Sequence, residues 1–303
     1  MERGDLVHRS YWVAAAALSL AIVAAIPLGQ PAAVAVATIV FIGGGLPHGA
    51  YDIALLRRTI TLGRAQLALA VAGYLVVAVG MAALWMTLPL VALILFLAVA
   101  AVHFGEDWQM LDEPLLRVAA GAAVIAAPTL GHPADVARLF VALSDDRAVL
   151  LTQLVTAAAP VTLLVTSVGI AIAWKDGSRQ WAAAMAVCLV LLVVAPPVAG
   201  FALFFVFLHS PRHLRQTRAQ LGPMPRLRWL ATGVGVSGAA ILGWSALQWL
   251  APSAVDPNLT VQAFRLLAAV AVPHLLLSRW VERRLASNHQ HRRGSALSGT
   301  GSL

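Results

Sequence analysis

The longest stretches of this chain carry no charged residue. Residues 11–28, 66–86, 148–174 and 181–208 are predominantly apolar, and about 20 helical residues are enough to cross the hydrocarbon core of a bilayer. Only 11% of the 303 residues are charged, whereas soluble domains have roughly 25%. The sequence therefore predicts an all-α, polytopic transmembrane helical bundle.

Hydropathy and the position of the polar loops predict about ten spans, within a range of eight to ten. The expected spans are 11–28, 32–54, 66–86, 89–105, 115–131, 149–174, 181–196, 198–213, 229–251 and 262–282. The division at Pro196-Pro197 is open, because a single kinked helix there would remove one span. Residues 133–144 have apolar positions at helical spacing and predict a helix along the outer interface.

Arginines gather in three short polar segments, 57–64, 212–228 and 279–293. With a cytoplasmic N-terminus, the ten-span arrangement puts all three on the same side of the membrane, as the positive-inside rule requires. We therefore expect a multi-pass protein of the cell inner (cytoplasmic) membrane with both termini in the cytoplasm. These loops explain the net charge of +8, so the expected partner is the lipid bilayer and no nucleic acid.

Four histidines lie at the ends of predicted spans two, four and eight: His48, His103, His209 and His213. All three ends reach the cytoplasmic side in this arrangement, so the histidines can meet at one depth. Ionisable residues at membrane depth are costly and mark functional sites. Imidazole suits Fe, Cu, Zn and Ni, and the only cysteine, Cys188, lies inside an apolar run. We predict a metal site between helices with these four histidines as ligands.

Three acidic residues and a fifth histidine accompany this group. Asp52 and Asp107 each follow a histidine by four residues, and a metal-bound imidazole normally donates its other N–H to a carboxylate or carbonyl. We expect them to act as such acceptors, the alternative being solvated carboxylates at helix ends; Glu106 is expected to be solvated. His274 lies inside span ten at a different apparent depth, and ligand, pocket and structural roles are all open.

Aromatic residues surround the predicted histidine site. Tyr51, Phe104 and Phe205 are the nearest in sequence, and residues of this kind near helix ends usually anchor a helix at the interface or fill the core. The alternative is that they line a slot for a long apolar substrate. The same choice applies to Phe41, Trp108, Phe201, Phe204 and Phe207.

The residues around the histidines resemble the motifs of the Brp/Blh-type β-carotene 15,15′-dioxygenase family. These are Gly45-x-Pro47-His48-Gly49-Ala50-x-Asp52, His103-Phe104-Gly105 with Asp107, His209-x-x-x-His213-Leu214 and Pro273-His274. The resemblance implies an integral membrane enzyme that cleaves the central double bond of β-carotene with O2, releasing two retinal molecules. It further implies Fe(2+) bound by His48, His103, His209 and His213, and a functional link to a retinal-binding rhodopsin.

On this reading, residues 1–285 form one integral membrane catalytic domain. Residues 286–303 are rich in Ser, Gly, His and Arg and predict a disordered cytoplasmic tail. Two alternatives are a haem- or metal-binding membrane transport protein and a membrane di-iron desaturase or hydroxylase, although the chain has only one HxxxH box. A rhodopsin is excluded, because the only lysine, Lys175, lies in a predicted loop.

Overall fold

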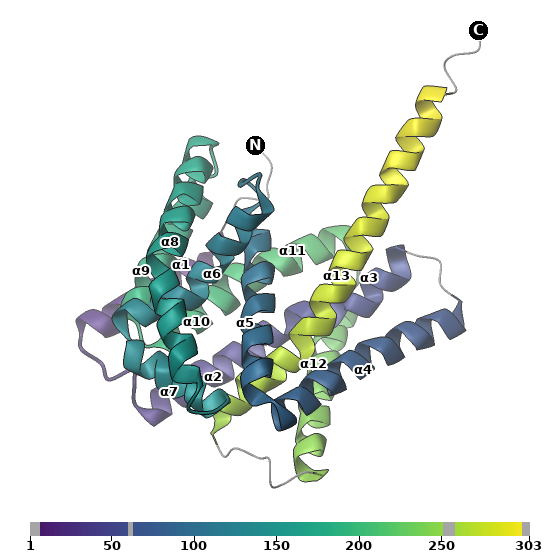
Figure 1. The fold of residues 1–303 in the computed structure, drawn as a ribbon. Coiled ribbons are helices and arrows are strands. Elements are labelled where there is room, and N and C mark those ends of the chain that lie inside the picture. Colours follow the sequence, from purple (N-terminus) through teal and green to yellow (C-terminus); the bar gives the residue numbers. More distant parts are fainter. Residues whose placement is uncertain (1–6, 60–62, 251–257, 299–303) are drawn as a thin grey trace.

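The computed structural model describes the backbone of residues 7–59, 63–250 and 258–298, and side chains as far as Trp280. Every regular element in these ranges is a helix (Figure 1), which confirms the predicted all-α class. The α-helices are α1 (Arg9–Val23), α2 (Pro31–Gly45), α3 (Asp52–Thr59), α4 (Arg64–Thr87), α5 (Pro89–Gly105), α6 (Pro114–Gly131), α7 (Pro133–Leu143), α8 (Ala148–Lys175), α9 (Arg179–Val194), α10 (Pro197–Ala202), α11 (Ser210–Leu221), α12 (Arg226–Leu250) and α13 (Leu259–Ser298).

Three short elements of other helix types interrupt this pattern. They are the 3₁₀-helices η2 (Leu46–Tyr51) and η3 (Glu106–Trp108) and the π-helix η4 (Leu203–His209). Five of the α-helices begin at a proline, whose fixed φ and missing N–H suit the first helical position; they are α2, α5, α6, α7 and α10.

Seven helices in the described ranges are long and apolar enough to cross a membrane, which supports a polytopic membrane protein. They are 31–58, 64–87, 89–108, 114–131, 148–175, 226–250 and 259–280. The prediction of about ten spans adds three segments to these. Two of them, α1 and α9, have only 15 and 16 residues, and the third, 198–213, is broken into α10, the π-helix and the polar start of α11.

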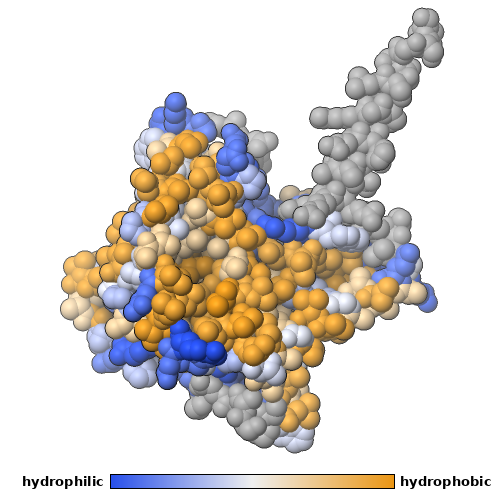
Figure 2. Space-filling model, viewed as in Figure 1, coloured by the Kyte–Doolittle hydropathy of each residue, from blue (hydrophilic) through white to orange (hydrophobic). Residues whose placement is uncertain are grey.

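The outer surface carries many large apolar side chains. Leu69, Val190 and Trp249 are exposed over 75%, 61% and 82% of their surface. Figure 2 shows that apolar residues cover most of one face, with hydrophilic residues in smaller patches. Contiguous apolar surface of this extent marks contact with a membrane or another protein, and the long apolar helices favour lipid.

Close packing of α5 against α6 depends on Gly121 of α6, which lies against Gly105 of α5. A Cβ on Gly121 would lie 2.2 Å from the backbone oxygen of Ala101 and 2.4 Å from the backbone nitrogen of Gly105. Only a residue without a side chain fits where two helix backbones approach so closely. This contact holds the C-terminal half of α5, including His103, in a defined position.

The last long helix, α13, runs through the interior of the bundle. It packs against α2, α4 and α5, and a buried hydrogen bond of 2.9 Å joins Thr38 of α2 to Thr260 of α13. By contrast, α12 lies at the periphery, and Gly233 is its only fully buried residue in the described range. The interior position of α13 brings His274 close to segments made much earlier in the chain.

Two predicted secondary features can be compared with the structure. Of the predicted helix 133–144, Pro133–Leu143 form α7, with Val136, Phe140 and Leu143 buried, so the helix is confirmed. The helix α13 continues to Ser298, through most of the segment 286–303 in which the sequence predicts disorder. Disorder and a cytoplasmic location of 286–303 both stay predictions, and residues 299–303 lie outside the described range.

Candidate metal centre

Five histidines from four parts of the chain meet inside the bundle. His48 lies on η2, His103 in the last turn of α5, His209 at the end of η4, His213 on α11 and His274 on α13. Possible ligand atoms of His48, His103 and His274 all lie within 4.8 Å of one another, and the same holds for His103, His209 and His213. His103 belongs to both groups. The structure thus brings together the four predicted ligands and adds His274, which the sequence places at another depth.

Local sequence explains how His48 reaches this centre. After Gly45 the chain tightens from α-helix to the 3₁₀-helix η2, which carries Pro47 and His48. A Cβ on Gly45 would lie 2.2 Å from Cε1 of Phe205. Since glycine has no side chain, the π-helix can press against the end of α2. That contact sets His48 beside His209, with ring centroids 5.6 Å apart.

The π-helix places His209 in the core. Its residues Phe204, Phe205 and Leu208 are buried, and His209 is completely inaccessible to solvent. A π-helix adds a residue to the turn, and such turns are frequent at functional sites. Here the wider turn lets Phe205 pack flat against His209, with ring centroids 5.6 Å apart, while His213 follows one turn later with a centroid distance of 4.4 Å.

Four of the histidines are oriented in the same way. Nδ1 of His48 donates to the carbonyl oxygen of Gly45 at 2.5 Å, and the other three contacts go to carboxylates. These pairs are His103 with Glu106 at 3.0 Å, His209 with Asp107 at 2.7 Å and His274 with Asp52 at 2.8 Å. Oxygen acceptors of this kind fix the tautomer and leave Nε2 as the ligand atom.

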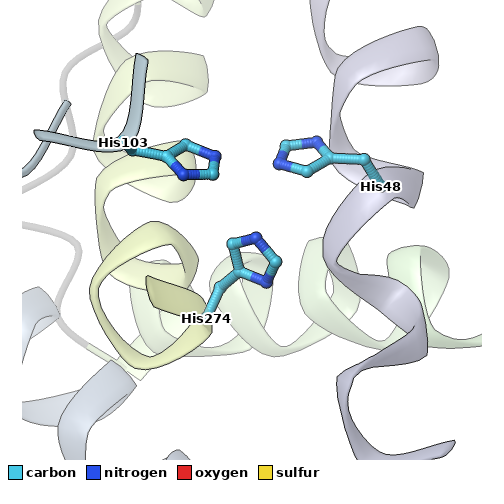
Figure 3. Close-up of side chains that lie close together, drawn as sticks. All are labelled: His48, His103 and His274. Atoms are coloured by element: carbon cyan, nitrogen blue, oxygen red, sulfur yellow. The ribbon is translucent and has the colours of Figure 1, made fainter. Parts of the chain in front are cut away.

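The Nε2 atoms turn toward a common space. Figure 3 shows the rings of His48, His103 and His274 pointing inward from three different helices, each with its outer nitrogen toward the centre. Nε2 of His103 lies 3.1 Å from Nε2 of His209. Nε2 of His274 is buried and has no hydrogen-bond partner among the described residues.

This arrangement fits a metal ion. Nδ1 of His103 and Nδ1 of His209 both donate hydrogen bonds, so the Nε2 atom of each ring carries a lone pair and no hydrogen. These two lone pairs face each other, and they repel unless a cation lies between them. Metal–imidazole bonds are about 2.0–2.1 Å for Zn²⁺, so two imidazole nitrogens that share one ion lie within about 4 Å of each other. The observed 3.1 Å agrees with that spacing, and the unpaired Nε2 of His274 supplies a further donor.

The carboxylates differ from the sequence expectation in their partners. Asp52 and Asp107 do accept imidazole N–H bonds, but from His274 and His209 of other segments rather than from the histidines four residues before them. Glu106, expected to be solvated, holds His103 instead. The three-residue spacing of His103 and Glu106 could have indicated this contact, because residues three apart share a helix face.

Two arginines offset this concentration of negative charge. Arg279 donates to Glu106 at 3.4 Å, and Nε of Arg212 lies 3.7 Å from Asp107. Arg212 also lies over the ring of Trp181, 4.5 Å from its centroid. These contacts surround the carboxylates with fixed donors, and sequence spacing gave no indication of them because the partners are far apart in the chain.

A largely apolar cavity of about 440 Å³ adjoins the histidines. His48, His103 and His274 line it together with the predicted aromatic residues Phe104 and Phe205. Its size is within the usual range of ligand pockets. A smaller cavity of about 50 Å³, bordered by polar groups such as Glu106, Gln216 and Ser278, touches the same three histidines.

Tyr51 does not belong to this centre. Its ring stacks on Trp229 with centroids 3.9 Å apart, and its hydroxyl donates to the carbonyl of Trp229 at 2.9 Å. The expectation of a pocket role for Tyr51 is therefore not met, because the side chain faces α12 while His48 faces inward. Tyr74 of α4 is an addition: it lines the cavity together with Asp52.

The fold and the centre together define an all-helical membrane protein with a buried cluster of histidines beside an apolar cavity. The family model for beta-carotene 15,15'-dioxygenase matches residues 36–282, and the chain belongs to this family. That range includes all five histidines of the centre.

Two relatives agree with this membership. The chain is 28% identical over 262 residues to beta-carotene 15,15'-dioxygenase of uncultured marine bacterium 66A03, covering 82% of this chain and 93% of the relative. It is also 27% identical, over 318 aligned positions, to probable beta-carotene 15,15'-dioxygenase Blh of Halobacterium salinarum. That alignment covers 90% of this chain and 91% of the relative. No solved structure matches the chain.

Proposed function

We propose that this protein is a membrane-embedded dioxygenase that cleaves the central 15,15′ double bond of β-carotene with O2 and forms two molecules of all-trans-retinal. The observation that carries the proposal is the histidine centre on the wall of an apolar cavity, in a chain that matches the family from residue 36 to residue 282. Both relatives carry the name of this activity.

We propose that the cofactor is a non-haem Fe(2+) ion held by His48, His103, His209 and His213, with His274 as an additional imidazole donor. All five donors are nitrogen atoms, which suit iron. When bound, such an ion supplies the redox chemistry through which O2 is used for cleavage. The fixed Nδ1 contacts of His48, His103, His209 and His274 support their part in this set, because they hold these rings in place before the ion binds.

The protein residues themselves position the substrate and exclude water. Transfer of a C40 hydrocarbon from water to apolar surroundings is strongly favourable. Phe104, Phe205 and the small apolar residues of α12 and α13 offer such surroundings. The histidines are the main polar groups of that wall. The polyene is thereby presented to the metal centre while bulk water is kept away.

We propose that the protein lies in the inner (cytoplasmic) membrane with ten spans and both termini in the cytoplasm. The segments α1, α9 and 198–213 would complete the ten in addition to the seven long apolar helices. The support is the grouping of arginines in 57–64, 212–228 and 279–293, which the positive-inside rule assigns to one side. Supply of retinal to a rhodopsin would follow from the proposed reaction.

The reaction itself can be tested in cells that produce β-carotene. Expression of the protein should convert β-carotene to retinal as the only carotenoid product, measured by chromatography. With isotopically labelled O2 and purified protein, each retinal should carry one labelled oxygen atom, because a dioxygenase places one atom on each new aldehyde. Longer apocarotenals, or no conversion by iron-loaded protein, would contradict the proposal.

The carboxylates should act through the imidazoles that they hold. Asp52→Asn and Asp107→Asn keep a neutral oxygen acceptor, so we expect each to lower iron affinity or turnover by about 10- to 100-fold. Iron per chain and retinal formation are measured together. The matched control is Asp145→Asn, since Asp145 pairs with Arg147 away from the centre and should behave as wild type.

A double substitution separates orientation of His274 from a direct role of Asp52. If Asp52 acts through His274, then adding Asp52→Asn to His274→Ala should not lower iron affinity any further. The interaction that Asp52→Asn would weaken is already lost in His274→Ala. Additive losses would mean that Asp52 contributes by another route. Wild-type iron affinity in His274→Ala would remove His274 from the ligand set.

A further inference from the structure

The apolar cavity is formed by four long helices that differ in how deeply they are buried. Helices α5 and α13 contribute interior residues such as Phe96, Leu266 and Ala269, all at most 5% exposed. Helices α4 and α12 contribute residues that line the cavity and also reach the outer surface. Leu75, Val79 and Val236 are exposed over 57%, 51% and 47% of their surface. The cavity therefore reaches the surface on the side of α4 and α12.

These two helices leave a passage because each packs against other elements. In the described part of the chain, α4 packs on α13 and α5, whereas α12 packs mainly on η2 and only lightly on α13. Close packing of α4 against α12 is absent from the described contacts. The opening between them is bordered by Leu75 and Val79 on one side and by Val236 and Gly243 on the other.

The surroundings of the opening are apolar. Helix α4 has no charged residue after Arg64, and α12 has none after Arg228. Val76, Val234 and Leu242 beside the opening are exposed over 70%, 71% and 72% of their surface. Both helices are candidate membrane spans, so these side chains face acyl chains and the opening leads into hydrocarbon.

The lining of the cavity extends along α12, and His48, His103 and His274 line the same cavity. A Cβ on Gly233 would lie 2.8 Å from the hydroxyl of Tyr51, which places the first half of α12 beside η2 and hence near His48. The lining residues of α12 run from Val236 to Leu247, a length of about 16 Å at 1.5 Å per residue. A rod-shaped polyene can lie along this helix with one part at the metal centre.

We propose that the opening between α4 and α12 is the entrance through which β-carotene passes from the bilayer to the histidines. This inference rests on the proposed function for the identity of the substrate. A lateral entrance means that the C40 hydrocarbon stays in apolar surroundings throughout, so no step requires its transfer through water. Gly243, Leu75 and Val79 then determine which molecules can enter.

Two glycines of the same helix provide a matched test. A Cβ on Gly243 or on Gly238 would meet no described atom within 4 Å, so a larger side chain fits at either position. Gly243 lines the cavity, while Gly238 is absent from the described lining. We expect Gly243→Phe to lower kcat/KM for β-carotene by about tenfold or more, as for a filled hydrophobic pocket, with unchanged iron per chain. Gly238→Phe should match wild type in both.

A binding measurement separates the entrance from the reaction. Proteins purified without O2 from cells that produce β-carotene are analysed for β-carotene per chain, which requires no turnover. Wild type and Gly238→Phe should retain β-carotene, and Gly243→Phe should retain about tenfold less. The proposed entrance would be overturned if Gly243→Phe bound and cleaved β-carotene like wild type. Equal losses in the two glycine variants would overturn it too, as would phospholipid in place of β-carotene in the wild-type protein. Retention without any cleavage by wild type would instead overturn the proposed function while the entrance stands.

Discussion

Replacing His103 with alanine should remove both bound iron and β-carotene cleavage. His103 is the one histidine that belongs to both groups of candidate ligands in the described structure, and its Nε2 lies 3.1 Å from that of His209. Loss of a direct ligand should exceed the roughly 10- to 100-fold effect of losing an outer contact. Metal analysis of the purified variant and retinal formation measure the two effects.

The control for this experiment is His132→Ala. His132 caps the end of α6 and donates from Nε2 to the carbonyl of Val194 at 3.1 Å, away from the centre. The His132→Ala variant should keep the wild-type iron content and turnover. If His103→Ala also keeps both, the metal centre as described is wrong. If it keeps iron and loses turnover, His103 acts on the substrate and is not a required ligand.

Replacing Gly121 with leucine should prevent normal assembly of the bundle. The new Cβ would lie 2.2 Å from the carbonyl oxygen of Ala101 and 2.4 Å from the backbone nitrogen of Gly105. Backbone atoms cannot turn away as a side chain can, so α5 must separate from α6. Overpacking usually costs about 1–3 kcal/mol and occasionally more, and a backbone clash belongs at the upper end. Thermal unfolding in detergent and iron per chain are the measurements.

A second glycine serves as the comparison for Gly121→Leu. A Cβ on Gly80 of α4 would meet no described atom within 4 Å, and leucine favours a helix more than glycine does. Gly80→Leu should therefore unfold at or above the wild-type temperature. Equal thermal stability of the two variants would show that α5 and α6 can separate without loss, contrary to the role assigned to Gly121.

The fold class and the histidine cluster could be predicted because both depend on local patterns. Long charge-free runs predict membrane helices, and His48, His103 and His209 each lie at the end of such a run, with His213 four residues after His209. Helix ends on the same side of a membrane lie at a similar depth, so three short motifs predicted one centre. The structure brings these four side chains together.

The partners of the histidines could not be predicted in the same way. Sequence spacing identifies neighbours on one helix, and it directed Asp52 and Asp107 toward the histidines four residues earlier. The structure pairs them with His274 and His209, since packing of α13 and of the π-helix brings other segments closer. Tertiary packing also places His274 at the level of the centre and directs Tyr51 toward α12.

The contact between Asp52 and His274 has a consequence for biosynthesis. The two residues are 222 positions apart, and a chain grows at about 5–20 residues per second, so Asp52 is made roughly 10–40 s before its partner. By the end of that interval the segments that carry His48, His103, His209 and His213 have all been made, while the fifth imidazole is still missing. Ligation by all five imidazoles of the proposed site would therefore follow synthesis of the last long helix, so completion of the site would be a late step in maturation of the protein.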